Sequence, residues 1–168
     1  MASYKIKWYT NFYLVLAFYT NFVLTSGDCK DLYQQQLLRS TASAMVVEST
    51  NPSQVQLQVF LSTAQQLWSF QRGSRAGLFY ILHESSGMVL DINICDSEGQ
   101  SCTLKLTSLN PNNRQQQWFI NKDGTIANSF NLMNLEVQGG IYAKGTPIVI
   151  SNPNGLLQQQ FTLQDRSQ

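Results

Sequence analysis

Short stretches of alternating apolar and polar residues run along the chain from about residue 32 to residue 163. A period of two is typical of a β-strand that buries one face. Turn-forming residues separate the stretches, as in Asn152-Pro-Asn-Gly155. No stretch of about 11 residues in this part of the chain has a helical period. The pattern therefore predicts an all-β fold.

The pattern repeats three times, and each repeat ends in a Gln-x-aromatic motif. The motifs are Gln66-Leu-Trp68, Gln116-Gln-Trp118 and Gln159-Gln-Phe161. Earlier in each repeat, one strand ends in an acid, and the acids are Glu48, Asp91 and Glu136. The strand between the acid and the motif of each repeat has apolar residues two apart, in Val55-Gln-Leu57, Cys102-Thr-Leu104 and Ile148-Val-Ile150. The sequence thus predicts four-stranded repeats over about 32–72, 78–121 and 125–164.

Twelve strands follow from these repeats. They are expected at 33–39, 44–48, 55–60, 67–70, 78–83, 88–93, 102–107, 117–120, 125–128, 132–137, 147–151 and 160–163. One repeat of this length cannot bury its apolar face alone, so the three must share a core. We expect that core to contain Trp68, Trp118, Phe161, Val47, Leu90 and Leu135. The first glutamine of each motif is expected to clamp a tight turn, because an amide both donates and accepts hydrogen bonds.

This set of motifs resembles the ricin B-chain-type lectin family, whose members fold as a β-trefoil. The resemblance covers about residues 32–163. It rests on three Gln-x-aromatic motifs in register with the strands that end in an acid and with the strands whose apolar residues are two apart. It implies a β-trefoil of three four-stranded repeats. As the leading function it implies carbohydrate binding, with glycans or glycoproteins as partners.

The family pattern also implies candidate site residues. A carboxylate ends strand two, an aromatic residue ends strand three, and an amide precedes the Gln-x-aromatic motif. The second repeat offers the best candidate, with Asp91, Thr103, Lys105 and Gln115. The first repeat is next, with Glu48, Gln56, Gln58 and Gln65. The third, with Glu136, Val149, Ser151 and Gln158, is the weakest.

The aromatic at the end of strand three is missing from every repeat, where Gln58, Lys105 and Ser151 stand instead. Lys105 is either a solvated lysine or a point cation for a sialylated or sulfated glycan. Asp91 fits a turn-capping acid as well as a ligand contact. Two aromatic residues lie outside the motifs, Phe60 after strand three of the first repeat and Tyr142 in a loop of the third. An exposed Tyr142 could restore a stacking face, although a loop tyrosine more often covers the edge of the core. The missing aromatics favour an alternative function, in which degenerate sugar sites leave a protein that acts through protein contacts as an inhibitor, adhesion protein or coat.

Composition narrows the function classes. Charged residues are 12% of the chain and the net charge is +1, which argues against a nucleic-acid binder. One histidine and three cysteines exclude zinc sites built from three histidines or four cysteines. No Gly-x-Ser-x-Gly or P-loop motif is present, and His83 fits a hydrogen-bonded residue at a strand end. We therefore expect a non-enzyme without a metal or cofactor.

The N-terminus has the pattern of a secretory signal peptide over residues 1–27. A basic start precedes a short apolar run and small residues, with cleavage expected before Asp28. An uncleaved anchor and a first buried strand are the alternatives. Cleavage would leave a secreted domain at 28–168 without a membrane segment.

Secretion makes disulfide bonds possible. Cys95 and Cys102 flank a segment with hairpin-loop composition, and a bridge or two buried thiols fit equally well. Cys29 is left over, either free or available for a covalent dimer.

Overall fold

The structure, a computed structural model, describes residues 31–166 of the chain. The expected signal peptide and Cys29 lie outside the described residues. Among the residues that are described, no helix is long and apolar enough to cross a membrane.

Twelve strands make up the described part, which confirms the all-β prediction. They are β1 (Asp31–Ser40), β2 (Val46–Asn51), β3 (Gln54–Gln58), β4 (Leu67–Arg72), β5 (Phe79–His83), β6 (Met88–Cys95), β7 (Ser101–Thr107), β8 (Trp118–Ile120), β9 (Ile126–Asn128), β10 (Asn134–Val137), β11 (Ile148–Ser151) and β12 (Phe161–Asp165). The sequence pattern does not predict the short 3-10 helices, which are η1 (Ala64–Gln66), η2 (Arg114–Gln116), η3 (Gln138–Gly140) and η4 (Leu157–Gln159). Three of them, η1, η2 and η4, end on the glutamine of a Gln-x-aromatic motif.

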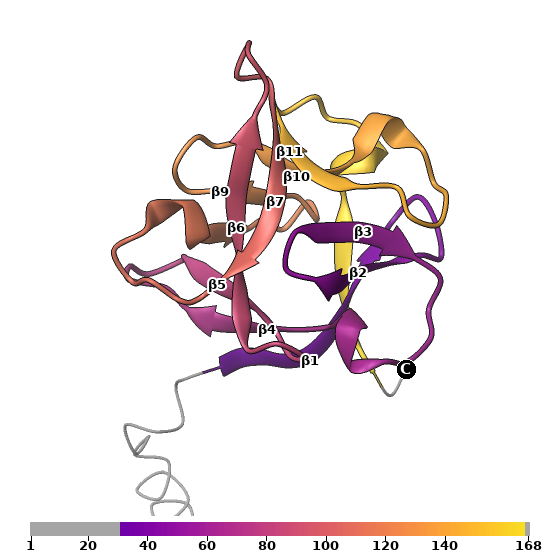
Figure 1. The fold of residues 1–168 in the computed structure, drawn as a ribbon, viewed down its shortest axis with the longest axis horizontal. Coiled ribbons are helices and arrows are strands. Elements are labelled where there is room, and N and C mark those ends of the chain that lie inside the picture. Colours follow the sequence, from indigo (N-terminus) through magenta and orange to yellow (C-terminus); the bar gives the residue numbers. More distant parts are fainter. Residues whose placement is uncertain (1–30, 167–168) are drawn as a thin grey trace, which may run out of the picture. The chain divides into compact units, whose positions relative to one another are not determined.

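The strands form a barrel and three hairpins, as Figure 1 shows. In the barrel, β12, β1, β4, β5, β8 and β9 pair in that order as antiparallel neighbours. The hairpins are β2–β3, β6–β7 and β10–β11. They contact one another because β7 pairs with β11 and Gln56 of β3 bridges to Pro147. This is the β-trefoil that the resemblance implies.

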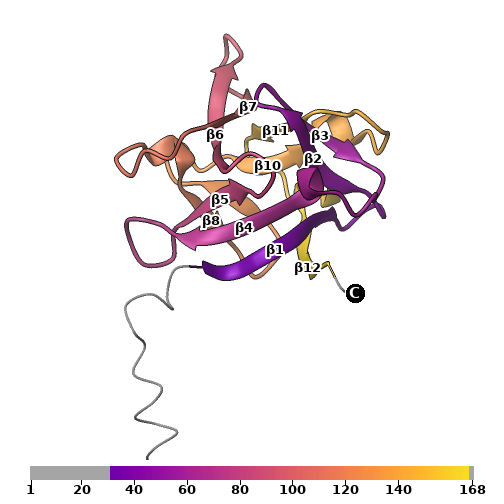
Figure 2. The same cartoon turned by 60° about the horizontal axis from the view of Figure 1, so that its bottom comes forward.

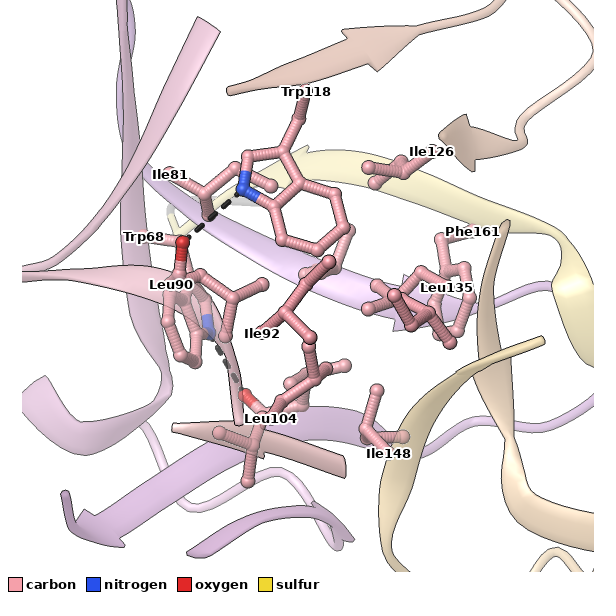
Figure 3. Close-up of a cluster of buried hydrophobic side chains, with 14 of the residues drawn as sticks. Trp68, Ile81, Leu90, Ile92, Leu104, Trp118, Ile126, Leu135, Ile148 and Phe161 are labelled. Atoms are coloured by element: carbon pink, nitrogen blue, oxygen red, sulfur yellow. Dashed lines mark hydrogen bonds between the residues drawn. The ribbon is translucent and has the colours of Figure 1, made fainter. Parts of the chain in front are cut away.

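The aromatic residues of the three motifs occupy equivalent positions in the barrel. Each lies directly opposite a residue of a neighbouring barrel strand. The pairs are Trp68–His83 between β4 and β5, Trp118–Asn128 between β8 and β9, and Phe161–Ser40 between β12 and β1. The three rings are buried in one core cluster with Val47, Leu90 and Leu135, as Figure 3 shows for most of this set. The triplication predicted from the sequence is confirmed.

Two of the aromatic residues also hold the neighbouring hairpin strand. The indole N–H of Trp68 donates to the carbonyl of Val47 at 3.0 Å, and that of Trp118 donates to Leu90 at 3.2 Å (Figure 3). Each accepting residue immediately precedes the acid of its repeat, so the hydrogen bond from the core fixes the position of the backbone beside the acid. Phe161 packs in the same place without a donor.

A disulfide bond joins Cys95 to Cys102 across the β6–β7 hairpin. Of the two alternatives that the sequence leaves open, the structure therefore contains the bridge. Cys102 is buried against the core, whereas Cys95 is exposed on the extended tip of the hairpin.

Candidate functional site

The three acids lie at equivalent, buried places beside the barrel. Glu48, Asp91 and Glu136 are 4%, 4% and 7% exposed. Each accepts a hydrogen bond from the side-chain amide of the glutamine that begins the motif of its repeat. The Nε2-to-carboxylate distances are 2.9 Å for Gln66, 3.0 Å for Gln116 and 2.7 Å for Gln159. A buried charge needs such partners because it has lost its hydration.

The same glutamines hold the loop after strand three. In every repeat the amide oxygen accepts a backbone N–H, from Leu61 at 2.8 Å, Asn110 at 2.8 Å and Asn154 at 3.1 Å. In every repeat the amide nitrogen also approaches a loop carbonyl, that of Val59, Ser108 or Asn152. The predicted turn clamp is confirmed, and the clamp extends to the acid.

The strand pairing corrects one part of the sequence alignment. Gln56 lies opposite Glu48, Lys105 opposite Asp91 and Val149 opposite Glu136, so these three are equivalent. In the second repeat, Thr107 and not Lys105 therefore occupies the position of Gln58 and Ser151. The β6–β7 hairpin is longer than the others, so counting from Cys102 gives a register two residues too early.

This correction moves Thr103 away from Asp91. Thr103 lies two residues nearer the hairpin tip than Lys105, and its hydroxyl exchanges hydrogen bonds with the backbone of Ile94 at 3.2 Å. Lys105 is half-buried and directly opposite Asp91. Within residues 31–166 its ammonium group makes no hydrogen bond or ion pair.

The residue that ends strand three donates a hydrogen bond to the acid in all three repeats. Gln58 reaches Glu48 at a long 3.4 Å, Thr107 reaches Asp91 at 2.9 Å, and Ser151 donates to Glu136. In each repeat a small polar group therefore turns inward from the position at which the family pattern has an aromatic residue.

Asp91 and Glu136 accept all their hydrogen bonds through one carboxylate oxygen, whereas Glu48 uses both, and only in Asp91 is the other oxygen buried. Oδ2 accepts from Thr107 at 2.9 Å, Asn113 at 3.2 Å and Gln116 at 3.0 Å. Oδ1 is buried and has no hydrogen-bond partner among the described residues. The backbone N–H of Gln115 donates to Asn113, which in turn binds Asp91, and the half-buried Gln115 side chain makes no hydrogen bond within the described part.

The first repeat places its predicted residues less tightly around the acid. The amide of Gln56 accepts a hydrogen bond from Gln54 at 2.6 Å, although Gln56 faces Glu48 across the strands. Gln65 uses its backbone carbonyl to bind the His83 ring. Among the described residues, only Gln58 and Gln66 donate hydrogen bonds to the Glu48 carboxylate.

In the third repeat, Glu136 accepts hydrogen bonds from Ser151, from Asn154 at 3.1 Å and from Gln159. Sequence reasoning missed Asn113 and Asn154 as partners of the acids. They stand at different distances from their motifs, three residues before Gln116 and five before Gln159, so no common spacing marks them.

His83 is a hydrogen-bonded structural residue, as expected. Its Nδ1 lies 2.9 Å from Ser86 Oγ, its Nε2 lies 3.0 Å from the carbonyl oxygen of Gln65, and its ring packs at 4.8 Å from Trp68. Burial lowers its pKa, against opposing effects of the Gln65 carbonyl and nearby glutamates. Among the described residues, no three His, Cys, Asp or Glu side chains are grouped to hold a metal ion.

The two loop aromatics are partly exposed, Phe60 at 40% and Tyr142 at 37%. The loop that carries Tyr142 lies against the end of β3, where the N–H of Gly145 donates to Leu57 at 2.8 Å. Phe60 follows the same strand end. Both rings thus offer surface outside the core, on loops beside the first repeat.

A family profile described as ricin-type beta-trefoil lectin domain-like matches residues 64–151, a little more than half of the chain. The chain belongs to the ricin-type β-trefoil lectin family. The match spans the second repeat and reaches into the two flanking repeats, which is where the sequence resemblance is clearest. No curated protein sequence matches the chain.

Solved structures of other proteins have the same fold. A designed threefold symmetric protein, ThreeFoil, is 17% identical with a TM-score of 0.70, over 77% of this chain and 97% of that one. The ricin B-like lectin of Macrolepiota procera, solved with lactose, is 22% identical with a TM-score of 0.67, over 79% and 95%. The C-terminal half of an earthworm R-type lectin, solved with GalNAc, is 16% identical with a TM-score of 0.59, over 78% and 98%.

Proposed function

We propose that this protein is a secreted lectin that binds carbohydrate at the second repeat without catalysing a reaction. The observation that carries the proposal is the bare Oδ1 oxygen of Asp91. Buried carboxylate oxygens nearly always have donors, and one without a donor costs about 1–3 kcal/mol or more. A sugar hydroxyl is a donor of the right kind, and two adjacent hydroxyls can share one carboxylate.

The groups around Asp91 suit such a ligand. Lys105 lies opposite the acid, and Gln115 follows Asn113 in the loop that contacts it. Within the described residues, the side chains of Lys105 and Gln115 have no partners that binding would break. A ligand reaches the buried oxygen only if a neighbouring side chain moves, and these two are the least restrained.

The first and third repeats offer weaker binding sites than the second. In the first repeat both oxygens of Glu48 accept hydrogen bonds, from Gln58 and Gln66. In the third repeat the residue opposite the acid is Val149, which offers no polar group. We therefore place binding at Asp91, with Lys105 and Gln115 as the flanking contacts.

Two further findings support the proposal. The similar lectins solved with lactose and with GalNAc are sugar-binding members of the same fold. The Cys95–Cys102 bridge fits the oxidising compartment that a signal peptide implies. The three acids sit in separate repeats and not as a pair in one cleft, so they do not form the carboxylate pair that a glycosidase needs.

A glycan array with the full chain tests this function. We expect binding to at least one glycan class, and a tenfold or greater loss in Asp91→Asn, which keeps the size of the side chain. Glu136→Gln makes the matched change in the third repeat and should leave binding unchanged. Absence of any glycan binding by folded protein would refute the lectin proposal, and unchanged binding by Asp91→Asn would refute the site.

A second candidate is a trefoil with degenerate sugar sites that acts through protein contacts. The inward-turned Gln58, Thr107 and Ser151 favour it, because no aromatic face is left for stacking at these positions. The exposed apolar run Val59, Phe60 and Leu61 would then provide contact surface. A folded protein without glycan affinity, whose binding to a protein partner is weakened by Phe60→Ser, would support this candidate.

A further inference from the structure

A cavity of about 370 Å³ lies outside the sites described above, beside the loop that joins β4 to β5. Figure 2 shows the course of this loop. The cavity walls come from that loop, from the segment around η2, from β8 and from the residue after β9. The lining residues are Ser74, Arg75, Ala76, Leu78, Pro111, Asn112, Arg114, Gln117, Phe119 and Ser129. This volume suits one monosaccharide or a comparable small molecule.

Hydrogen bonds between the walls hold the cavity in shape. The buried Gln117 joins two of them, because its Oε1 accepts from Ser74 Oγ at 2.7 Å and its Nε2 donates to the Pro111 carbonyl at 3.3 Å. The guanidinium of Arg114 donates to the Ser129 carbonyl at 2.8 Å, and Ser129 Oγ returns a bond to the Arg114 carbonyl at 3.0 Å. Side chains from three distant segments thus form a fixed wall.

The arginines set this cavity apart from a related one. Arg114 is the first residue of η2, and the equivalent first residues of η1 and η4 are Ala64 and Leu157. Gln117, by contrast, has an equivalent in the third repeat, because Gln160 follows η4 as Gln117 follows η2. A cavity of about 380 Å³ lies at the corresponding place beside the β8–β9 loop, and an acid, Asp123, is among its lining residues. The threefold architecture thus accounts for the hollow, and the two arginines are particular to the cavity beside the β4–β5 loop.

The chemistry of the lining is basic on one side and apolar on the other. Arg75 and Arg114 carry positive charge, and no Asp or Glu is among the lining residues given above. In the described part of the chain the side chain of Arg75 makes no hydrogen bond or ion pair. Leu78 and Phe119 supply apolar surface, and Asn112 supplies an amide.

We propose that this cavity binds an anionic sugar residue, a uronate or a sulfate ester. Guanidinium groups pair with carboxylate and sulfate oxygens in a planar fork, and an aromatic ring packs on the C–H face of a sugar. The asparagine amide can bind a hydroxyl. The cavity acts separately from Asp91, and only the choice of a sugar as carrier of the anion rests on the proposed function.

Calorimetric titration of the full chain tests the cavity with four probes: a sulfated heparin tetrasaccharide, trigalacturonate, lactose and inorganic sulfate. We expect one of the two acidic oligosaccharides to bind at least about tenfold more tightly than lactose and than sulfate, with affinity that falls as salt rises. Trigalacturonate alone would identify a uronate site, and the heparin fragment alone a sulfate site.

Arg75→Gln is the main variant, since the Arg75 side chain makes no hydrogen bond or ion pair within the described residues, and it should weaken the binding of the acidic oligosaccharides about three- to tenfold. Arg114→Ala should weaken it at least as much, and Lys122→Gln on the β8–β9 loop makes the same change in charge as a control. The proposal is overturned if both arginine variants bind as the parent does, or if sulfate binds as tightly as the oligosaccharides. Loss of acidic binding in Asp91→Asn but not in Arg75→Gln would overturn the cavity and leave the proposed function standing.

Discussion

Replacing Gln116 with leucine measures what the glutamine clamp contributes to stability. The side chain lies at the centre of the second repeat, where Oε1 binds Asn110 N–H at 2.8 Å. Nε2 lies 3.0 Å from Asp91, 2.8 Å from Thr107 and 3.1 Å from the Ser108 carbonyl. Because the amide carries two hydrogens, two of these three contacts are satisfied at one time. Leucine keeps most of the volume and removes all of them.

The expected loss follows from the kind of bond removed. A hydrogen bond to a carboxylate contributes about 1.5–3 kcal/mol, and a neutral one contributes about 1 kcal/mol. One bond of the first kind and two of the second sum to about 4 kcal/mol. Asn110 and Ser108 are exposed and regain water, which leaves a net loss of about 3 kcal/mol.

Urea unfolding followed by the fluorescence of the buried Trp68 and Trp118 measures this loss. A change of about 3 kcal/mol lowers the midpoint by about 1–2 M urea at an ordinary slope. Gln115→Leu is the matched control, since the adjacent Gln115 side chain makes no hydrogen bond within the described residues, and it should cost under about 0.5 kcal/mol. A loss below about 1 kcal/mol in Gln116→Leu would refute the clamp as an organiser of the repeat.

Three further predictions concern other parts of the fold. The Cys95–Cys102 bridge closes a short loop, and its reduction should lower the free energy of unfolding by about 2 kcal/mol. Urea unfolding with and without a thiol reductant measures this change. A Cys95→Ser variant that still responds to the reductant would contradict it. Trp118→Phe should cost about 1–3 kcal/mol, because the Leu90 carbonyl loses its donor and a cavity remains, and calorimetric melting measures it; an unchanged melting temperature would contradict the packing role. Burial lowers the pKa of His83 in the folded state, so the unfolded state binds the proton more readily and stability should fall as the pH drops below about 6.5. His83→Asn should flatten the pH dependence of the free energy of unfolding. A parent-like slope in the variant would refute the assignment.

The fold could be predicted from the sequence because its decisive contacts repeat at a fixed spacing. Trp68, Trp118 and Phe161 are separated by similar lengths of chain, and a shared core is the one arrangement that buries all three. Strand alternation then gives the twelve strands to within a few residues. The 3-10 helices escape prediction because three residues carry too little periodicity to be recognised.

The site could be predicted only in part. The acids and the motif glutamines follow from the repeats, but their mutual contact does not, because 25 residues separate Asp91 from Gln116 and an amide can turn to either side. The sequence pattern places Lys105 at the end of strand three, because it directly follows Cys102-Thr-Leu104. The longer β6–β7 hairpin, tied by its disulfide, places Thr107 there and moves Thr103 toward the tip.

The threefold pattern also indicates where function can reside in this chain. An acid that is bound by a glutamine and a strand-three side chain in every repeat is part of the architecture, so its presence alone does not mark a binding site. Binding chemistry has to be sought where one repeat departs from the other two. The second repeat departs at the buried oxygen of Asp91 that has no hydrogen-bond partner, at Lys105, whose side chain has no partner within the described residues, and at the arginine that begins η2. Two of these, Asp91 and Arg114, lie at the loop of residues 110–114. That loop contacts Asp91 through Asn113 on one side and lines the basic cavity on the other, which makes it the segment whose substitution should affect both sites at once.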